Sequence, residues 1–177
     1  MTTANKLTLL RMALIPVFLV LFYTGHLYWA LGVFIAASLT DFLDGYIARH
    51  YNQITNFGKF MDPLADKVLV MSAMCCFVEV GRMPGWALAI VLLREFAVSG
   101  MRLVAVEQGR VIAAAWSGKI KTAVTMVCLC AMLLNAGGDI YISFLNDGVC
   151  VLLILATTVA SGVEYFIKNR DVFKNAD

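Results

Sequence analysis

The chain has 177 residues, of which 61% are hydrophobic and only 15% are charged, and its formal net charge is +2. A water-soluble domain of this size needs more polar residues to cover its surface, so the composition argues against one and favours a protein embedded in lipid. Because one span of the hydrocarbon core takes about 20 apolar residues, five or six spans would fill the chain. We therefore expect a single membrane domain over residues 1–177.

Six apolar segments, separated by short polar links, follow one another along the chain. They are predicted at Leu7–Tyr23, Leu27–Ala48, Met61–Val80, Pro84–Val106, Lys119–Ala136 and Gly148–Ile167. Backbone groups in hydrocarbon have no water to bond, so each segment should be an α-helix. The first segment shows no small-residue cleavage site and is expected to be a retained helix. The predicted fold class is all-α, a polytopic membrane protein with six transmembrane helices whose consecutive members are antiparallel neighbours.

The basic residues indicate the orientation of these helices. With a cytoplasmic N-terminus, one side of the membrane collects Lys6, Arg49, Lys59, Arg110, Lys119, Lys121, Lys168, Arg170 and Lys174. The other side has only Arg82, together with Asp139 and Asp147. By the positive-inside rule, both termini should be cytoplasmic, and the plasma membrane is the expected location.

The five cysteines all lie within apolar runs: Cys75, Cys76, Cys128, Cys130 and Cys150. None belongs to a CxxC pair or to a cluster with histidines. We expect reduced thiols that pack as small hydrophobic groups.

Four aspartates interrupt the apolar pattern near one side of the membrane. Asp41 and Asp44 are three residues apart at the end of the second segment, and Asp62 and Asp66 are four apart at the start of the third. Each spacing puts the pair on one helix face, and a helical hairpin would bring the two pairs together. Pro63 suits the first turn of a helix, which predicts Asp62 at or near its N-cap.

Four carboxylates beside hydrocarbon cannot all stay ionised unless cations neutralise them. An all-oxygen set without Cys or His favours Mg²⁺ or Mn²⁺, and two ions about 3.5–4 Å apart would suit phosphoryl chemistry. Gly45 and Gly58 leave space for a phosphate to approach the backbone. Intramembrane carboxylates also occur in cation-coupled transporters, so spacing alone leaves metal-dependent catalysis and transport open.

The segment from residue 41 to 66 resembles the signature of the CDP-alcohol phosphatidyltransferase family, D-x2-D-G-x2-A-R-x8-G-x3-D-x3-D. All eight fixed positions are present: Asp41, Asp44, Gly45, Ala48, Arg49, Gly58, Asp62 and Asp66. Residues 5–11 with Pro16, residues 94–102 and residues 118–122 are similar to phosphatidylglycerophosphate synthases within the family. The transporter alternative would need repeats and broken helices, and neither is evident.

The resemblance implies a fold, a reaction and roles for individual residues. In this family an acceptor hydroxyl attacks the β-phosphorus of a CDP-activated lipid, here CDP-diacylglycerol, and CMP leaves. Asp41, Asp44 and Asp62 would bind the metal, while Asp66 would complete the site and act as the general base. The positions that would hold the cytidine diphosphate are Gly45, Ala48, Arg49 and Gly58, with Asn5, Thr8 and Arg11 over the same pocket. A homodimer is implied by the family alone, and no nucleic-acid partner is expected.

Four basic residues at the cytoplasmic ends of the fourth and fifth segments suit a phosphorylated acceptor: Arg102, Arg110, Lys119 and Lys121. Glycerol 3-phosphate fits and agrees with the subfamily resemblance. Contact with lipid head groups is the alternative role for these residues. Related acceptors (inositol phosphate, serine or phosphatidylglycerol) would differ only in this pocket and stay open. Arg94 and Glu95, deep in the fourth segment, are expected to be paired structural supports.

Overall fold

The computed structural model describes residues 3–50, 56–109, 112, 115–138 and 140–170, with the backbone alone for residues 3–8, 41–50 and 56–66. Within these ranges the chain is all-helical. The α-helices are α1 (Thr3–Tyr23), α2 (Leu27–His50), α3 (Asn56–Glu79), α4 (Gly85–Glu107), α5 (Trp116–Gly137) and α6 (Asp147–Lys168), and a short 3-10 turn, η1 (Ser143–Leu145), precedes α6. Each of the six predicted segments is therefore a helix.

The prediction that Asp62 is an N-cap is wrong. Helix α3 begins at Asn56, so Asp62 and Pro63 lie in its second turn. Proline in a helix interior removes one backbone hydrogen bond, and a long helix tolerates this loss when its neighbours support it. The chain repeats this feature in α1, where Pro16 also lies inside the helix.

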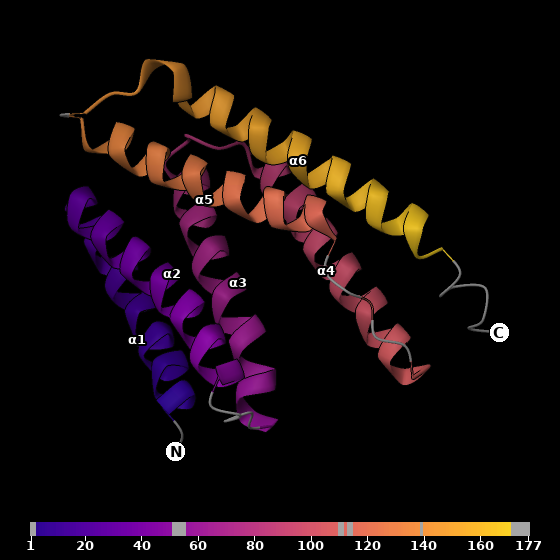
Figure 1. Ribbon diagram of the computed structural model, residues 1–177. Helices are drawn as coiled ribbons and strands as arrows, with labels where there is room; N and C mark the ends of the chain where they lie inside the picture. Colours follow the sequence, from indigo (N-terminus) through magenta and orange to yellow (C-terminus); the bar gives the residue numbers. More distant parts are fainter. Residues whose placement is uncertain (1–2, 51–55, 110–111, 113–114, 139, 171–177) are drawn as a thin grey trace.

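The helices form two groups that meet along α5. Helix α1 packs against α2 and α3, and α5 packs against α6 and also against α2. Figure 1 shows α1, α2 and α3 grouped together, with α5 and α6 running side by side across them. Among the described residues, α4 packs mainly on α6 rather than on α5, its neighbour in sequence. The prediction of consecutive neighbours is therefore right for α1–α2 and α5–α6 but wrong for α4–α5.

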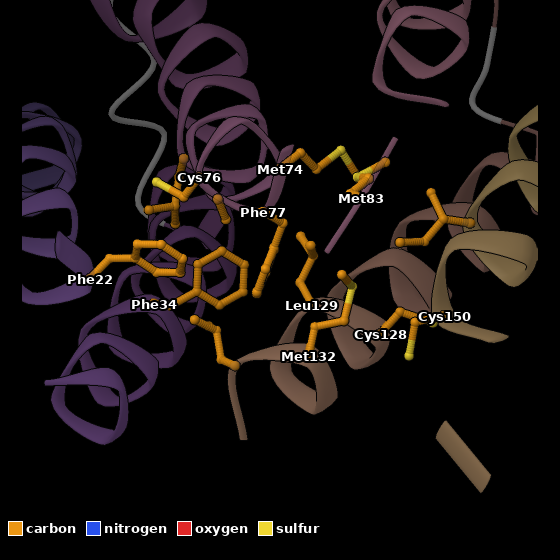
Figure 2. Packing of buried hydrophobic residues seen from close by; sticks show 14 of the residues in the cluster. Phe22, Phe34, Met74, Cys76, Phe77, Met83, Cys128, Leu129, Met132 and Cys150 are labelled. Atoms are coloured by element: carbon orange, nitrogen blue, oxygen red, sulfur yellow. The ribbon is translucent and has the colours of Figure 1, made fainter. Parts of the chain in front are cut away.

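An aromatic cluster connects the first three helices. The Phe18 ring lies 5.9 Å from Phe34 and 6.1 Å from Phe22, and the Phe22 ring meets Phe77 edge-on at 5.7 Å between centroids. Edge-to-face and tilted contacts of this kind stabilise beyond the area they bury. Figure 2 shows the cluster continuing through Leu129 toward the second helical group. One core thus holds the two groups together.

Sulfur-containing side chains fill the remainder of this core. Cys76, Cys128 and Cys150 are buried, and all five cysteines of the chain are free thiols. Met74, Met83 and Met132 lie around them (Figure 2), and each of these methionines is buried. Flexible methionines and small cysteines suit the irregular gaps between helices that cross at different angles.

Many large apolar side chains lie on the outside of the molecule. Leu93 and Phe96 of α4, Val127 of α5 and Leu152 of α6 are 72%, 66%, 59% and 65% exposed. Monomeric soluble proteins rarely expose apolar surface on this scale. Among the described residues, α5 and α6 are long and apolar enough to cross a membrane. Both observations favour a membrane environment.

Polar contacts connect the helix ends on the side predicted to be poor in basic residues. Arg82, in the link before α4, pairs with Asp147 at the start of α6 at 3.3 Å. The Tyr23 hydroxyl at the end of α1 donates to Glu79 at the end of α3. The Asn135 side chain accepts from the Ile142 amide at 2.7 Å. Arg82 and Asp147 thus share one end of the molecule, as predicted.

Substitution of Gly137 tests the close approach of α2 to α5. A Cβ atom at Gly137 would lie 2.8 Å from Cζ of Tyr28, so Gly137→Ala must displace the Tyr28 ring from its place between the two helices. We expect a loss of about 1–3 kcal/mol in the free energy of unfolding, measured by SDS titration in mixed micelles. Gly32→Ala in α2 is the matched control, because nothing lies within 4 Å of its added Cβ. Equal stability of the two variants would contradict this packing.

Candidate functional site

A cavity of about 690 Å³ lies between α3, α4 and α5. Its α4 wall is built from Val91, Glu95, Val98 and Arg102, which recur every three or four residues and so share one helix face. Apolar residues form part of the lining, and polar side chains form the remainder. The polar lining residues are Lys67, Arg94, Glu95, Ser99, Arg102, Lys119, Lys121, Thr122 and Thr125.

Glu95 is at the centre of the charges in this cavity. Its Oε1 lies 2.7 Å from Nζ of Lys121 in α5 and 2.9 Å from Nη1 of Arg94. Its Oε2 lies 3.6 Å from Nζ of Lys67 in α3, and the same ammonium group donates to the Ser99 hydroxyl. A single carboxylate therefore connects three helices. Arg94 and Glu95 are therefore paired with each other, and their role as structural supports stays a prediction.

Among the side chains that the structure describes, the charges around Glu95 do not balance. Lys67, Arg94 and Lys121 carry three positive charges against one negative charge on Glu95. The side chains of Arg94 and Lys121 are only 13% and 7% exposed, so water screens them weakly. Arginine and lysine side chains grouped in this way suit an anionic ligand such as a phosphate, which they bind through charge-assisted hydrogen bonds.

Two glycines lie beside Arg94. A Cβ atom at Gly162 of α6 would lie 3.2 Å from Cγ of Arg94, and one at Gly118 of α5 would lie 3.7 Å from its Nη2. The arginine stem thus passes close to the α6 backbone before its guanidinium reaches the cavity. A Cβ atom at Gly162 would press on the arginine stem, whereas one at Gly118 would make an ordinary van der Waals contact with the guanidinium.

The predicted acceptor residues are partly brought together. Arg102, Lys119 and Lys121 all line the cavity, whereas Arg110 lies outside the described residues. Lys119 lies over the Trp116 ring, 4.9 Å from its centroid, and Lys121 is buried against Glu95. Arg102 donates from Nε to the Tyr165 hydroxyl at 3.0 Å.

The four aspartates are placed by the helix backbone only. Asp41 and Asp44 belong to the C-terminal part of α2, and Asp62 and Asp66 to the N-terminal part of α3. Asp66 directly precedes Lys67 and lies one turn before Val70, both of which line the cavity. The aspartate segment of α3 is therefore continuous with the cavity wall.

The side chains of the predicted metal and nucleotide residues lie outside the described part of the structure, apart from Arg11, which is fully buried. This holds for Asn5, Thr8, Asp41, Asp44, Gly45, Ala48, Arg49, Gly58, Asp62 and Asp66. Among the side chains that are described, no three His, Cys, Asp or Glu residues lie close enough together to hold a metal ion. The donor set itself, four carboxylates without sulfur or imidazole, fits a hard divalent cation.

Sequence reasoning did not find Ser99, Thr122 and Tyr165. Ser99 follows Glu95 by four residues and precedes Arg102 by three, so a polar stripe on α4 was a usable signal. Tyr165 gave no signal, because its contact with Arg102 joins residues 63 positions apart.

These features define a class of protein: an all-helical protein with apolar outer faces and a cation-lined cavity suited to an anionic ligand. Residues 1–162 match the CDP-alcohol phosphatidyltransferase family, and the chain belongs to that family. The resemblance seen in the aspartate motif is thereby confirmed.

Three relatives extend the similarity to nearly the whole chain. A Bacillus subtilis protein is 40% identical, over 98% of this chain and 97% of its own length. A Rickettsia typhi protein is 38% identical over 92% of this chain and about the same share (93%) of its own length. A Shigella flexneri protein is 36% identical over 93% of this chain and 92% of its own length. All three are named CDP-diacylglycerol–glycerol-3-phosphate 3-phosphatidyltransferase.

Glu95→Gln tests the role of this carboxylate in holding the three helices. Removing its charge takes this partner from three cations, and we expect a loss of about 2–3 kcal/mol in the free energy of unfolding by SDS titration. This is less than the about 3–5 kcal/mol typical of a fully buried pair, because the Lys67 side chain is 31% exposed. The matched control is Glu164→Gln, whose exposed pair with Lys168 should matter little. If both variants unfold like the unmodified protein, Glu95 does not hold the cluster.

Proposed function

We propose that the chain transfers the phosphatidyl group of CDP-diacylglycerol to sn-glycerol 3-phosphate and so forms phosphatidylglycerophosphate and CMP. The observation that carries this proposal is the similarity of 36–40% over nearly the full chain to relatives named for that reaction. The cavity supports it, because clustered cations between α3, α4 and α5 suit an acceptor that carries a phosphate.

We further propose that all six helices cross the plasma membrane, with both termini and the active site on the cytoplasmic side. The exposed apolar side chains of α4, α5 and α6 support lipid contact around the molecule. The Arg82–Asp147 pair marks the end with few basic residues, which the positive-inside rule assigns to the outside. A homodimer, which the family implies, is the assembly we propose.

The aspartates are the proposed metal site. Asp41, Asp44, Asp62 and Asp66 would hold Mg²⁺ or Mn²⁺, with two ions expected for four carboxylates. When bound, divalent ions would neutralise the negative charge that grows on the departing CMP phosphate. Gly45, Ala48, Arg49 and Gly58, with Asn5, Thr8 and Arg11, would hold the cytidine diphosphate.

The chain's own residues would then position and activate the acceptor. Asp66 would take the proton from the attacking glycerol hydroxyl as the new oxygen–phosphorus bond forms and the bond to CMP breaks. A carboxylate that also binds a cation is a weak base, so much of the rate must come from positioning. Arg102, Lys119 and Lys121, together with Arg110, would hold the acceptor's phosphate. Support for this arrangement comes from the α3 backbone, in which Asp66 adjoins the cavity-lining Lys67.

The choice of acceptor is tested by CMP release. The purified protein is given CDP-diacylglycerol with Mg²⁺ or Mn²⁺, and glycerol 3-phosphate, glycerol, inositol phosphate, serine or phosphatidylglycerol is added in turn. We expect CMP release well above the acceptor-free rate only with glycerol 3-phosphate. Faster release with another acceptor would reassign the substrate within the family, and release with none of them would refute the transferase proposal.

Asp62→Asn tests the metal site. Loss of one ligand charge should lower the rate of CMP release by at least about tenfold. Residues that only hydrogen-bond to metal ligands already have effects of roughly ten- to a hundredfold when they are mutated. Titration with Mn²⁺, followed by its paramagnetic resonance signal, should show weaker binding in the same variant. Asp147→Asn is the control, because Asp147 pairs with Arg82 far from the aspartate motif. Normal Mn²⁺ affinity and turnover in Asp62→Asn would refute the assignment.

A further inference from the structure

Arg102 is held from one side by a buried tyrosine of another helix. Nε of Arg102 in α4 donates to the Tyr165 hydroxyl of α6 at 3.0 Å, and the guanidinium carbon lies 5.5 Å from the centroid of the Tyr165 ring. Both a hydrogen bond and a cation–π contact therefore fix the arginine. Arg102 is exposed and lines the cavity, whereas Tyr165 is 2% exposed.

The Tyr165 ring is itself well fixed. Val98, Met101 and Ala105, which share one face of α4, pack with it in a small buried cluster separate from the main core. Asn169 is the C-cap residue of α6. The Tyr165 carbonyl accepts from its backbone amide at 3.2 Å and from its side chain at 2.8 Å. A ring held by packing and by its own backbone gives its hydroxyl a defined position.

We propose that Tyr165 is a positioning residue for the acceptor phosphate and acts through Arg102. The Tyr165 bond occupies Nε, and it does not use the two terminal nitrogens of the guanidinium, which can form a fork with two phosphate oxygens. Holding Nε fixes the plane of the guanidinium at the cavity wall before the ligand arrives. The acceptor then binds without first ordering a long exposed side chain. This inference rests on the proposed function, because it takes the cavity as the glycerol 3-phosphate site.

Tyr165→Phe is the direct test, since it removes the hydroxyl and keeps the ring, its packing and its cation–π contact. We expect KM for glycerol 3-phosphate to rise roughly three- to tenfold, the effect of one lost neutral hydrogen bond. The kcat and the KM for CDP-diacylglycerol should change less than about twofold, because neither depends on how the free arginine is oriented. Tyr23→Phe, which also removes a tyrosine hydrogen bond but at the opposite end of the molecule, should leave all three constants unchanged.

A double-mutant cycle separates positioning through Arg102 from a general structural effect. Arg102→Ala should raise KM for glycerol 3-phosphate about tenfold or more, and adding Tyr165→Phe should then have no further effect. Arg102→Lys keeps the charge but lacks the planar fork that the Tyr165 hydroxyl orients, so Tyr165→Phe should have a smaller effect in that background. Titration of glycerol 3-phosphate alone onto each folded variant gives the same comparison without turnover.

The outcomes distinguish the two proposals. If Arg102→Ala leaves the glycerol 3-phosphate KM unchanged, the proposed acceptor site is wrong and this inference falls with it. If Arg102→Ala raises KM but Tyr165→Phe does not, the acceptor site stands and the role of Tyr165 is refuted. Equal effects of Tyr165→Phe in the presence and absence of Arg102, or equal changes in both substrates' KM values, would also refute positioning.

Discussion

The arrangement of this molecule depends on the need of buried charges for partners in a place with little water. A carboxylate or ammonium group costs several kcal/mol to bury alone, so the charged residues of the apolar helices must meet one another. Glu95 meets this requirement for Lys67, Arg94 and Lys121 at once. By doing so it brings α3, α4 and α5 around one cavity. Among the described side chains of this group, the cations outnumber the one carboxylate, an arrangement that suits an anionic ligand.

Two kinds of contact hold the helices together. The phenylalanine and methionine core joins α1, α2 and α3 to α5 and α6, and it needs only shape and apolar area. The first part of α4 joins this core through Ala87 and Val91, and the remainder is held by the Glu95 group and by the Tyr165 cluster. The part of α4 that carries Arg102 is therefore positioned by polar contacts and a small apolar cluster. A binding group on such a helix is sensitive to changes in its neighbours.

The sequence predicts the helices well and their packing less well. Apolar runs such as Gly148–Ile167 locate each helix, because a span in hydrocarbon leaves few alternatives. Contact faces are harder to predict, since lipid-facing and core-facing sides are both apolar, and the packing of α4 on α6 was therefore missed. The sequence predicts that Pro63 lies in the first turn of a helix, yet α3 begins seven residues before it. The segment from Asp41 to Asp66 indicated the family by its resemblance to the family signature, whereas Tyr165 required the structure, because only the fold brings it to Arg102.

The central claim is that glycerol 3-phosphate binds in the cavity between α3, α4 and α5. A structure determined with glycerol 3-phosphate bound would test it most directly, through the position of the phosphorus atom. The account predicts phosphate oxygens within hydrogen-bond distance of the Arg102 terminal nitrogens and of the Lys119 or Lys121 ammonium group, with the glycerol hydroxyls toward the aspartate segment of α3. A phosphate bound elsewhere, with this cavity empty or filled by lipid, would contradict the account.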